Sequence, residues 1–232
     1  MSISSSTAAG TAESVEGAAR RAVGWTVAGV VAGLAGIVGI QASGGVTAVY
    51  DESLAGNPVA IAARLAEQRP AVVVEHVGFA VAALALLVFA AGLARHLTSR
   101  LEPGSLLGPI AAGGLIVTST ICLIGTGLTT ELVFGLSEGT DLVPEFAVVG
   151  AHWLGTIPWL WAAAGVSALA VAIASLRHGA TPRWLGWASL VLGGLTALFG
   201  VSPLQYMAGF TGPVWVLVCA VGLWFAGRRA RS

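Results

Sequence analysis

The chain has 232 residues, of which 56% are hydrophobic and 9% are charged, and its 11 basic and 11 acidic residues give a formal net charge of zero. A soluble domain carries about 25% charged residues. This composition therefore excludes a soluble protein whose surface faces water, and it predicts an outer surface that faces lipid. The zero net charge, and the absence of a basic stretch with interleaved aromatic residues, argue against nucleic acid as a partner.

Apolar stretches organise the chain into membrane spans. Residues 1–19 are mostly small and polar, without apolar periodicity, and they predict a disordered cytoplasmic tail. The next apolar run is too long for a cleavable signal peptide, so it is predicted to stay as a signal anchor. Six stretches near or above the roughly 20 residues that cross a bilayer predict an all-α, polytopic bundle of six transmembrane helices over residues 20–229, with residues 230–232 as a cytoplasmic end. The predicted spans are residues 23–48, 71–94, 106–128, 147–175, 184–205 and 211–227.

Arginine predicts the orientation of these spans. One set of connecting segments holds nine arginines, whereas the other set holds only Arg64 and Arg69 among many acidic residues. Because positively charged segments stay in the cytoplasm, both termini are predicted to be cytoplasmic, in the inner (plasma) membrane of a cell. The lack of lysine and the wealth of alanine, glycine and valine indicate a bacterial, GC-rich origin. The nine arginines are Arg20, Arg21, Arg95, Arg100, Arg177, Arg183, Arg228, Arg229 and Arg231.

The two outer loops carry local signals. Asn57 followed by Pro58 is typical of a helix start, and Ile61 and Leu65 then recur on one face. This pattern predicts a short amphipathic helix on the outer surface. The second outer loop, residues 129–144, mixes acidic and apolar side chains, and it is expected to dip into the membrane interface in the same way.

Glycine is abundant inside the spans. Gly29 and Gly33 form a GxxxG pattern in the first span, and Gly193 and Gly194 lie in the fifth. Small residues let helix backbones approach closely in lipid. The pattern indicates close packing within one bundle, and a dimer interface is the alternative that it leaves open.

Polar side chains gather in the outer halves of the spans, and they form the candidate site. Polar groups at membrane depth must be paired or hydrated, and ionisable ones mark functional sites. Pro158 frees the backbone carbonyl of Leu154, which is one way to open a helix toward a cavity. We therefore predict an outward-facing polar vestibule above an apolar plug. Its predicted ligand-binding residues are Gln41, Glu75, His76, Glu145, His152 and Thr156.

Blander and more specific interpretations of the same residues compete. The polar side chains are also typical of simple solvation at the membrane interface. Two haems are excluded by the spacing of the histidines along the second and fourth spans, although one haem between His76 and His152 remains open. A metal ion held by Glu75, His76, Glu145 and His152 suits the ligand types, but no local ligand motif supports it. No P-loop, GxSxG or HExxH motif is present, so no cofactor and no catalytic residue is assigned.

Three stretches resemble a bacterial six-span integral membrane family, one of the families known as domains of unknown function. They are AGVVAGLAGIVGI followed by NPVAIAARLAEQ, then PAVVVEHVGFAVAALALLVFAAGLARHL, and finally TPRWLGWASLVLGGLTALFG before Pro213 and Trp224. The resemblance covers roughly residues 22–227. It implies the fold and the membrane location, and it implies no activity.

Two functions of different classes follow from this sequence. The first is a membrane protein that binds a small molecule or lipid in the vestibule, either as a transporter-like protein or as an accessory subunit of a membrane protein partner. The alternative is a membrane-embedded enzyme that performs acid–base chemistry on a lipidic substrate, with Glu75 or Glu145 and His152 as the reacting groups. Depth separates the two, because a catalytic acid needs a desolvated site whereas a rim carboxylate stays exposed.

Overall fold

The structure, a computed structural model, describes residues 5–137 and 142–229, and the side chains of residues 24–137 and 142–228. Its regular structure is entirely helical over these residues, which confirms the all-α prediction. The predicted C-terminal end, residues 230–232, and the loop acids Glu138 and Asp141 lie outside the described residues. The elements are α1 (Ser5–Ser43), η1 (Ala48–Tyr50), η2 (Glu52–Leu54), α2 (Pro58–Glu67), α3 (Arg69–Thr98), α4 (Leu107–Gly135), α5 (Pro144–Thr156), η3 (Ile157–Trp161), α6 (Ala162–Leu176), α7 (Arg183–Gly200), η4 (Gln205–Met207) and α8 (Ala208–Arg229).

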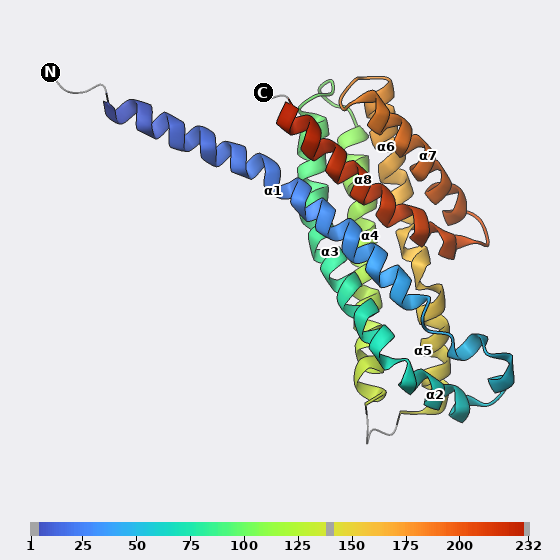
Figure 1. Cartoon of the computed structure of the whole chain (residues 1–232). Coiled ribbons are helices and arrows are strands. Elements are labelled where there is room, and N and C mark those ends of the chain that lie inside the picture. The colour runs from blue at the N-terminus through green and yellow to red at the C-terminus, as the bar shows by residue number, and fades with distance from the viewer. Residues whose placement is uncertain (1–4, 138–141, 230–232) are drawn as a thin grey trace.

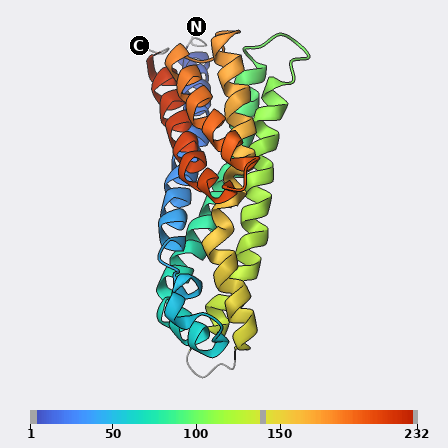
Figure 2. The same ribbon diagram turned by 90° about the vertical axis from the view of Figure 1, so that its right-hand side faces the viewer.

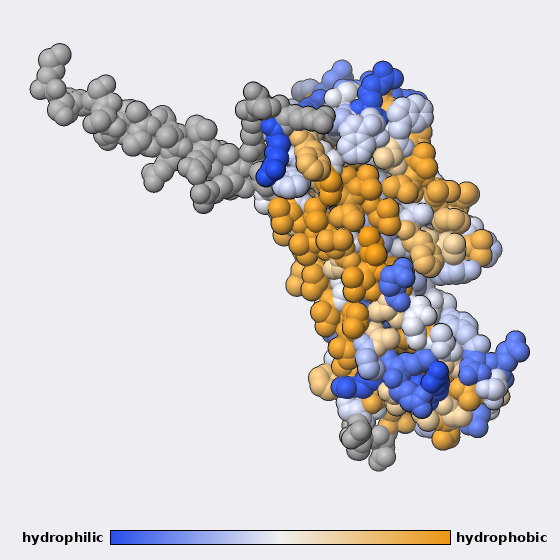
Figure 3. Space-filling model, viewed as in Figure 1, coloured by the Kyte–Doolittle hydropathy of each residue, from blue (hydrophilic) through white to orange (hydrophobic). Residues whose placement is uncertain are grey.

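Five segments of the described chain are long and apolar enough to cross a membrane, and Figure 3 shows apolar side chains as a broad band between two hydrophilic ends. The protein is therefore a multi-pass helical membrane protein. Helix α7 is not one of the five, so the sixth span stays a prediction. The five segments are Gly24–Ser43, Arg69–Thr98, Leu107–Gly135, Pro144–Leu176 and Gln205–Arg228.

Helix α1 begins inside the segment predicted to be a tail. Its backbone is helical from Ser5, whereas residues 1–19 were expected to lack regular structure. Residues 5–19 include five alanines, Ala8, Ala9, Ala12, Ala18 and Ala19, and alanine has the highest intrinsic helix propensity. A lack of apolar periodicity does not oppose a helix of this composition.

The helices form an elongated bundle whose members differ in length (Figures 1 and 2). Helix α3 has 30 residues and α4 has 29, whereas α7 has 18. At 1.5 Å per residue, α3 is about 45 Å long and α7 about 27 Å long. Both figures accordingly show the α7–α8 hairpin beside only one part of the bundle, while α3, α4 and α5 continue beyond its turn. That continuation is completed by α2.

Two hydrophobic cores follow this division. The bundle core includes Phe79, Phe89 and Trp161, which α3 and η3 direct toward α1, α4, α6 and α8. The second cluster, which we name the cap core, lies between the ends of α3 and α4 and the helices α2 and α5. Helix α2 contributes Ile61 and Leu65 to it, so the apolar face of this helix packs on protein. The other members of the cap core are Val46, Ala48, Val72, Leu132, Leu136, Ala147, Ala151 and Leu154.

Glycine lies where helices of the bundle cross. A Cβ atom on Gly33 would lie 2.7 Å from the backbone nitrogen of Leu217, and one on Gly29 would lie 2.5 Å from the ring of Phe89. Gly193 packs on the side chain of Ala168 in α6. These glycines therefore join helices within one chain, as the packing interpretation predicts.

Candidate functional site

Glu75 lies in the buried stripe of helix α3. This stripe follows the helical repeat through Val72, Glu75, Phe79 and Ala82, of which none exposes more than 1% of its surface. Val72 belongs to the cap core, and Phe79 belongs to the bundle core. Glu75 therefore lies at the seam between the two cores.

The carboxyl group of Glu75 has no partner among the described residues. Both of its oxygens are buried, and neither accepts or donates a hydrogen bond. The neighbouring helix α4, and α1 from residue 24 to residue 43, contain no arginine or lysine. The arginines of α3 lie in its first and last turns, at Arg69 and Arg95. A charged, unpaired carboxylate in such surroundings costs several kcal/mol, so a proton or an external cation must neutralise it.

His76 points to a different neighbour. Its Nδ1 atom lies 2.8 Å from the hydroxyl oxygen of Thr129 on α4, and that hydroxyl donates to the carbonyl of Thr126 at 3.1 Å. Consecutive residues on a helix point about 100° apart, so His76 faces α4 while Glu75 enters the core stripe. The histidine joins α3 to α4 near the cap core.

The other four predicted site residues are exposed. Gln41 lies on α1, Glu145 in the first turn of α5, and His152 and Thr156 farther along α5. The Thr156 hydroxyl donates to the backbone carbonyl of His152 at 2.9 Å. The His152 ring meets the ring of Tyr50 edge-on, with 6.2 Å between their centres.

These six side chains do not form one cluster. In the part of the chain that the structure describes, no hydrogen bond between side chains and no ion pair joins any two of them; the one bond between two of these residues runs from the Thr156 hydroxyl to the His152 backbone. Glu145 and His152 are seven residues apart, or about 10 Å along the helix axis. The structure thus separates one buried carboxyl group, Glu75, from a set of exposed polar groups around it.

A break in the fourth span lies beside the seam. Helix α5 ends at Thr156, the 3-10 segment η3 follows, and α6 begins at Ala162. Pro158 sits at the start of η3, where the sequence predicts an interrupted helix. The indole nitrogens of Trp153 and Trp161, before and within the break, are buried without a hydrogen-bond partner.

The break and Glu75 lie at similar depth. Phe79 packs on α1 at Gly39, where a Cβ atom would lie 2.7 Å from its ring. On α8, Gly209 packs on Pro158 of η3 and on the next residue of α1, Ile40. Glu75 is one helical turn beyond Phe79, toward the cap core. The α7–α8 hairpin turns just before Gly209, so its turn lies near the break as well.

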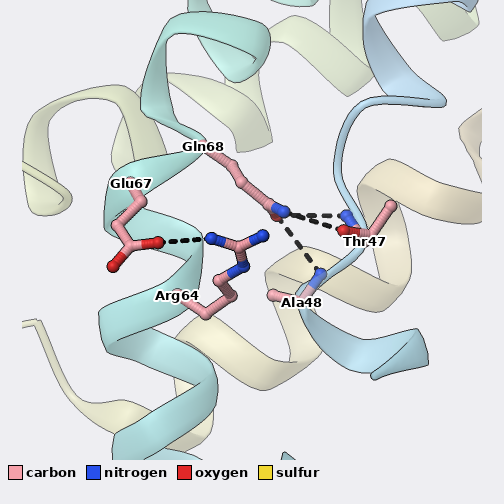
Figure 4. Close-up of polar contacts among 5 residues, drawn as sticks. All are labelled: Thr47, Ala48, Arg64, Glu67 and Gln68. Atoms are coloured by element: carbon pink, nitrogen blue, oxygen red, sulfur yellow. Dashed lines mark hydrogen bonds and ion pairs between the residues drawn. The ribbon is translucent and has the colours of Figure 1, made fainter. Parts of the chain in front are cut away.

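The side chain of Gln68, which we call the glutamine clamp, joins two segments of the chain through hydrogen bonds (Figure 4). The sequence analysis missed this residue. The Gln68 Oε1 atom accepts from the backbone nitrogens of Thr47 and Ala48 at 3.0 and 3.2 Å. Its Nε2 atom donates to the Thr47 hydroxyl at 2.8 Å. Gln68 thus ties the α2–α3 junction to the segment that leaves α1, and the Arg64–Glu67 ion pair lies beside it in Figure 4. Only its place between two helices hinted at this role.

The end of the molecule near the cap core is acidic, and we call it the acidic end. Arg64 forms an ion pair with Glu67, and Arg69 donates to the carbonyl of Val133 at 2.9 Å. Ser53 donates its backbone N–H and its hydroxyl to Asp51, at 3.0 and 2.6 Å, and these bonds lower the pKa of Asp51 below its usual value. The exposed acids of this end are Asp51, Glu52, Glu67, Glu131 and Glu145.

The described residues contain no cluster of ligands for the metal ion that the sequence analysis considered. No group of three or more histidine, cysteine, aspartate or glutamate side chains among the described residues could hold a metal ion. Cys122 and Cys219 are buried as free thiols. His76 and His152 face Thr129 and Tyr50.

Comparisons with known proteins identify no family and no relative of this chain. No protein-family model matches the chain, and neither the curated proteins nor the solved structures contain a match. The resemblance to a six-span family therefore stays a prediction.

Proposed function

We propose that this protein is a membrane-embedded carrier of the transporter type, which binds a small molecule at Glu75 after the molecule enters from the acidic end. The observation that carries the proposal is the complete burial of the Glu75 carboxyl group without a partner. Ionisable side chains inside membrane bundles mark substrate and ion pathways. The buried Glu75 carboxyl group destabilises the fold and bonds to no other described side chain, so we infer that it is retained to bind a molecule from outside the chain.

The interrupted fourth span supports this function. Transporters bind their substrates where membrane helices are broken, because the freed backbone groups line the site. Here the break at η3 brings two indole N–H donors, from Trp153 and Trp161, into the bundle without partners. A molecule that enters between the two cores would pass this break, which lies at a depth similar to that of Glu75.

The proposal includes a topology. Helix α1 enters the bundle from the end at which α8 finishes in Figures 1 and 2, and we take the chain to cross an even number of times. Helix α7, about 27 Å long, is then the sixth crossing. We place the arginine-rich end in the cytoplasm of a bacterium and the acidic end, with α2, outside its inner membrane. Cysteines introduced for exposed Ser53 and Ser99 test this in intact cells, because an impermeant thiol reagent should label only the first.

The enzymatic alternative has weaker support. Acid–base catalysis needs a second group within hydrogen-bond reach of the first. The nearest histidine in the sequence, His76, bonds to Thr129, whereas Glu145 and His152 are exposed and about 10 Å apart along α5. A binding function needs only the carboxyl group that the fold leaves unpaired.

A carbodiimide tests the carrier function on the native protein. An apolar carbodiimide, dicyclohexylcarbodiimide, reacts with protonated carboxyl groups inside the membrane, and mass spectrometry locates the adduct. A carrier that opens should be modified at Glu75 in native membranes, and Glu75→Gln should lose that adduct. A water-soluble carbodiimide should instead modify Glu52 and Glu145, which are exposed. If the water-soluble reagent modifies these two residues but dicyclohexylcarbodiimide gives no adduct at Glu75, the result would contradict an opening site.

A further inference from the structure

We infer that the ligand of this site is an organic cation with an apolar body, and that it exchanges with a proton on the Glu75 carboxyl group. This inference rests on the proposed function, because it names the class of molecule that the carrier takes. The sign of the charge, the side chains around Glu75 and the surface at the acidic end each point to this class.

The charge of the site selects a cation. Glu75 is the one ionisable side chain that is fully buried in the described bundle apart from the two thiols. No described arginine bonds to it, since Arg69 donates its hydrogen bond to the carbonyl of Val133 and Arg95 lies at the far end of α3. The positive charge that a carboxylate needs in this environment must therefore come from outside the chain. An anionic ligand would meet only repulsion.

The surroundings of the carboxyl group select an apolar body. Val72 and Phe79 lie one turn before and one turn after Glu75 on the same stripe. The ring of Trp161 packs on α1 at Gly36, one turn from Gly39, which the ring of Phe79 contacts. Apolar side chains and aromatic faces favour a bulky cation of low hydration, which gains both apolar contact and cation–π attraction. A strongly hydrated metal ion would lose its water shell here without oxygen ligands to replace it.

The acidic end favours the approach of such a molecule. Asp51, Glu52, Glu131 and Glu145 are exposed there, and no ion pair among the described residues neutralises them. The two hydrogen bonds from Ser53 keep Asp51 charged at lower pH than usual, because they lower its pKa. A surface of one sign raises the local concentration of counter-ions and their rate of association.

The exchange conserves charge at the site. The O–H bond of the Glu75 carboxylic acid breaks, its proton passes to water, and the resulting carboxylate pairs with the entering cation. Other groups are poor sources of this proton, because His76 bonds to Thr129, Cys122 lies in the bundle core, and His96 lies in the last turn of α3. Arg69 donates to the carbonyl of Val133, and the remaining groups are exposed. The titratable side chains on α3 and the helices around it are His76, Arg69, Arg95 and His96 on α3, Cys122 and Glu131 on α4, Arg64 and Glu67 on α2, and Glu145 and His152 on α5.

Binding of tetraphenylphosphonium to the purified full chain tests the inference, with proton release followed by a dye in weakly buffered solution. Tetraphenylborate has the same shape and the opposite charge, so it is the matched probe. Wild-type protein should bind the phosphonium ion and release protons, and it should not bind the borate. Glu75→Gln should lose about tenfold or more in affinity, since a charge-assisted contact contributes about 1.5–3 kcal/mol, and it should release no protons.

Two variants keep the test decisive. Glu75→Asp retains the charge and should retain proton-linked binding, whereas Glu102→Gln removes an exposed acid in the loop between α3 and α4, away from the acidic end, and should bind like the wild type. Binding that Glu75→Gln leaves unchanged, or equal binding of cation and borate, would overturn the inference. So would failure to bind either tetraphenylphosphonium or the smaller tetraethylammonium. Modification of Glu75 by dicyclohexylcarbodiimide alongside any of these results would leave the carrier function standing and refute only the ligand class.

Discussion

Replacing Glu75 with methionine should stabilise the protein. Methionine has nearly the same length and volume as glutamate, and it needs no hydrogen bond. Both carboxyl oxygens are buried without a partner, and leaving such a group unsatisfied costs about 1–3 kcal/mol in mutational data. The free energy of unfolding should rise by about that amount. For a chain of this size, about 2–4 °C accompany each kcal/mol, so Tm should rise by roughly 2–12 °C.

Thermal unfolding in detergent, followed by the fluorescence of the tryptophans, measures this effect. Glu145→Met is the matched control, because Glu145 is exposed in the first turn of α5. Its effect should stay within about 0.5 kcal/mol. A loss of more than about 1 kcal/mol in Glu75→Met would refute the reasoning, since it would show that the carboxyl group is paired in the folded protein.

Three further predictions address the elements around the site. A double-mutant cycle of His76→Ala and Thr129→Val should give a coupling energy of about 0.5–1.5 kcal/mol in thermal unfolding, because the two side chains share one hydrogen bond; additive effects would exclude that bond. Gln68→Ala should lower stability more than Gln68→Glu, which keeps the two bonds from backbone nitrogens and loses only the donor. Gly193→Ala should destabilise by about 1–3 kcal/mol, because its Cβ would meet Ala168. Gly194→Ala, with open space at that position, should be neutral or stabilising by up to about 1 kcal/mol. Equal effects of the two substitutions would show that α7 does not pack on α6 through Gly193.

Local signals in the sequence were sufficient where one residue's chemistry decides the backbone. Asn57 and Pro58 predict the start of α2, and the Asn57 side chain accepts from the backbone nitrogen of Ala60 at 3.1 Å. Pro158 predicts an interruption, and η3 begins beside it. Long apolar runs predict the membrane helices for the same reason, since only a helix satisfies its own backbone in lipid.

The grouping of the candidate site could not be predicted from spacing. Glu75 and His76 are neighbours in the sequence, yet the helix turns one into the core and the other toward Thr129. Glu145 and His152 share a stripe of α5, but periodicity does not say whether a stripe faces a partner helix or the outside. Here that stripe is exposed.

The inner part of the bundle is more polar than the sequence suggested. An apolar plug was expected there, yet Ser175 and Ser189 are buried, with at most 1% of their surface exposed. The Ser175 hydroxyl donates to the carbonyl of Val171 at 2.6 Å, and Ser189 accepts from the Trp215 indole at 3.0 Å. Single hydroxyl groups pair with a nearby backbone or indole group, so they fit into a packed bundle without a polar path.

Infrared spectroscopy of the carboxyl group tests most directly the claim that Glu75 is unpaired and neutral until a ligand arrives. A protonated carboxyl group absorbs apart from carboxylates and amides, and at the high end of its range when it makes no hydrogen bond. The difference spectrum between wild type and Glu75→Gln at neutral pH should contain that band, and a bound cation should remove it. A difference spectrum with only a carboxylate signal, or with a protonated band shifted by strong hydrogen bonds, would contradict the account.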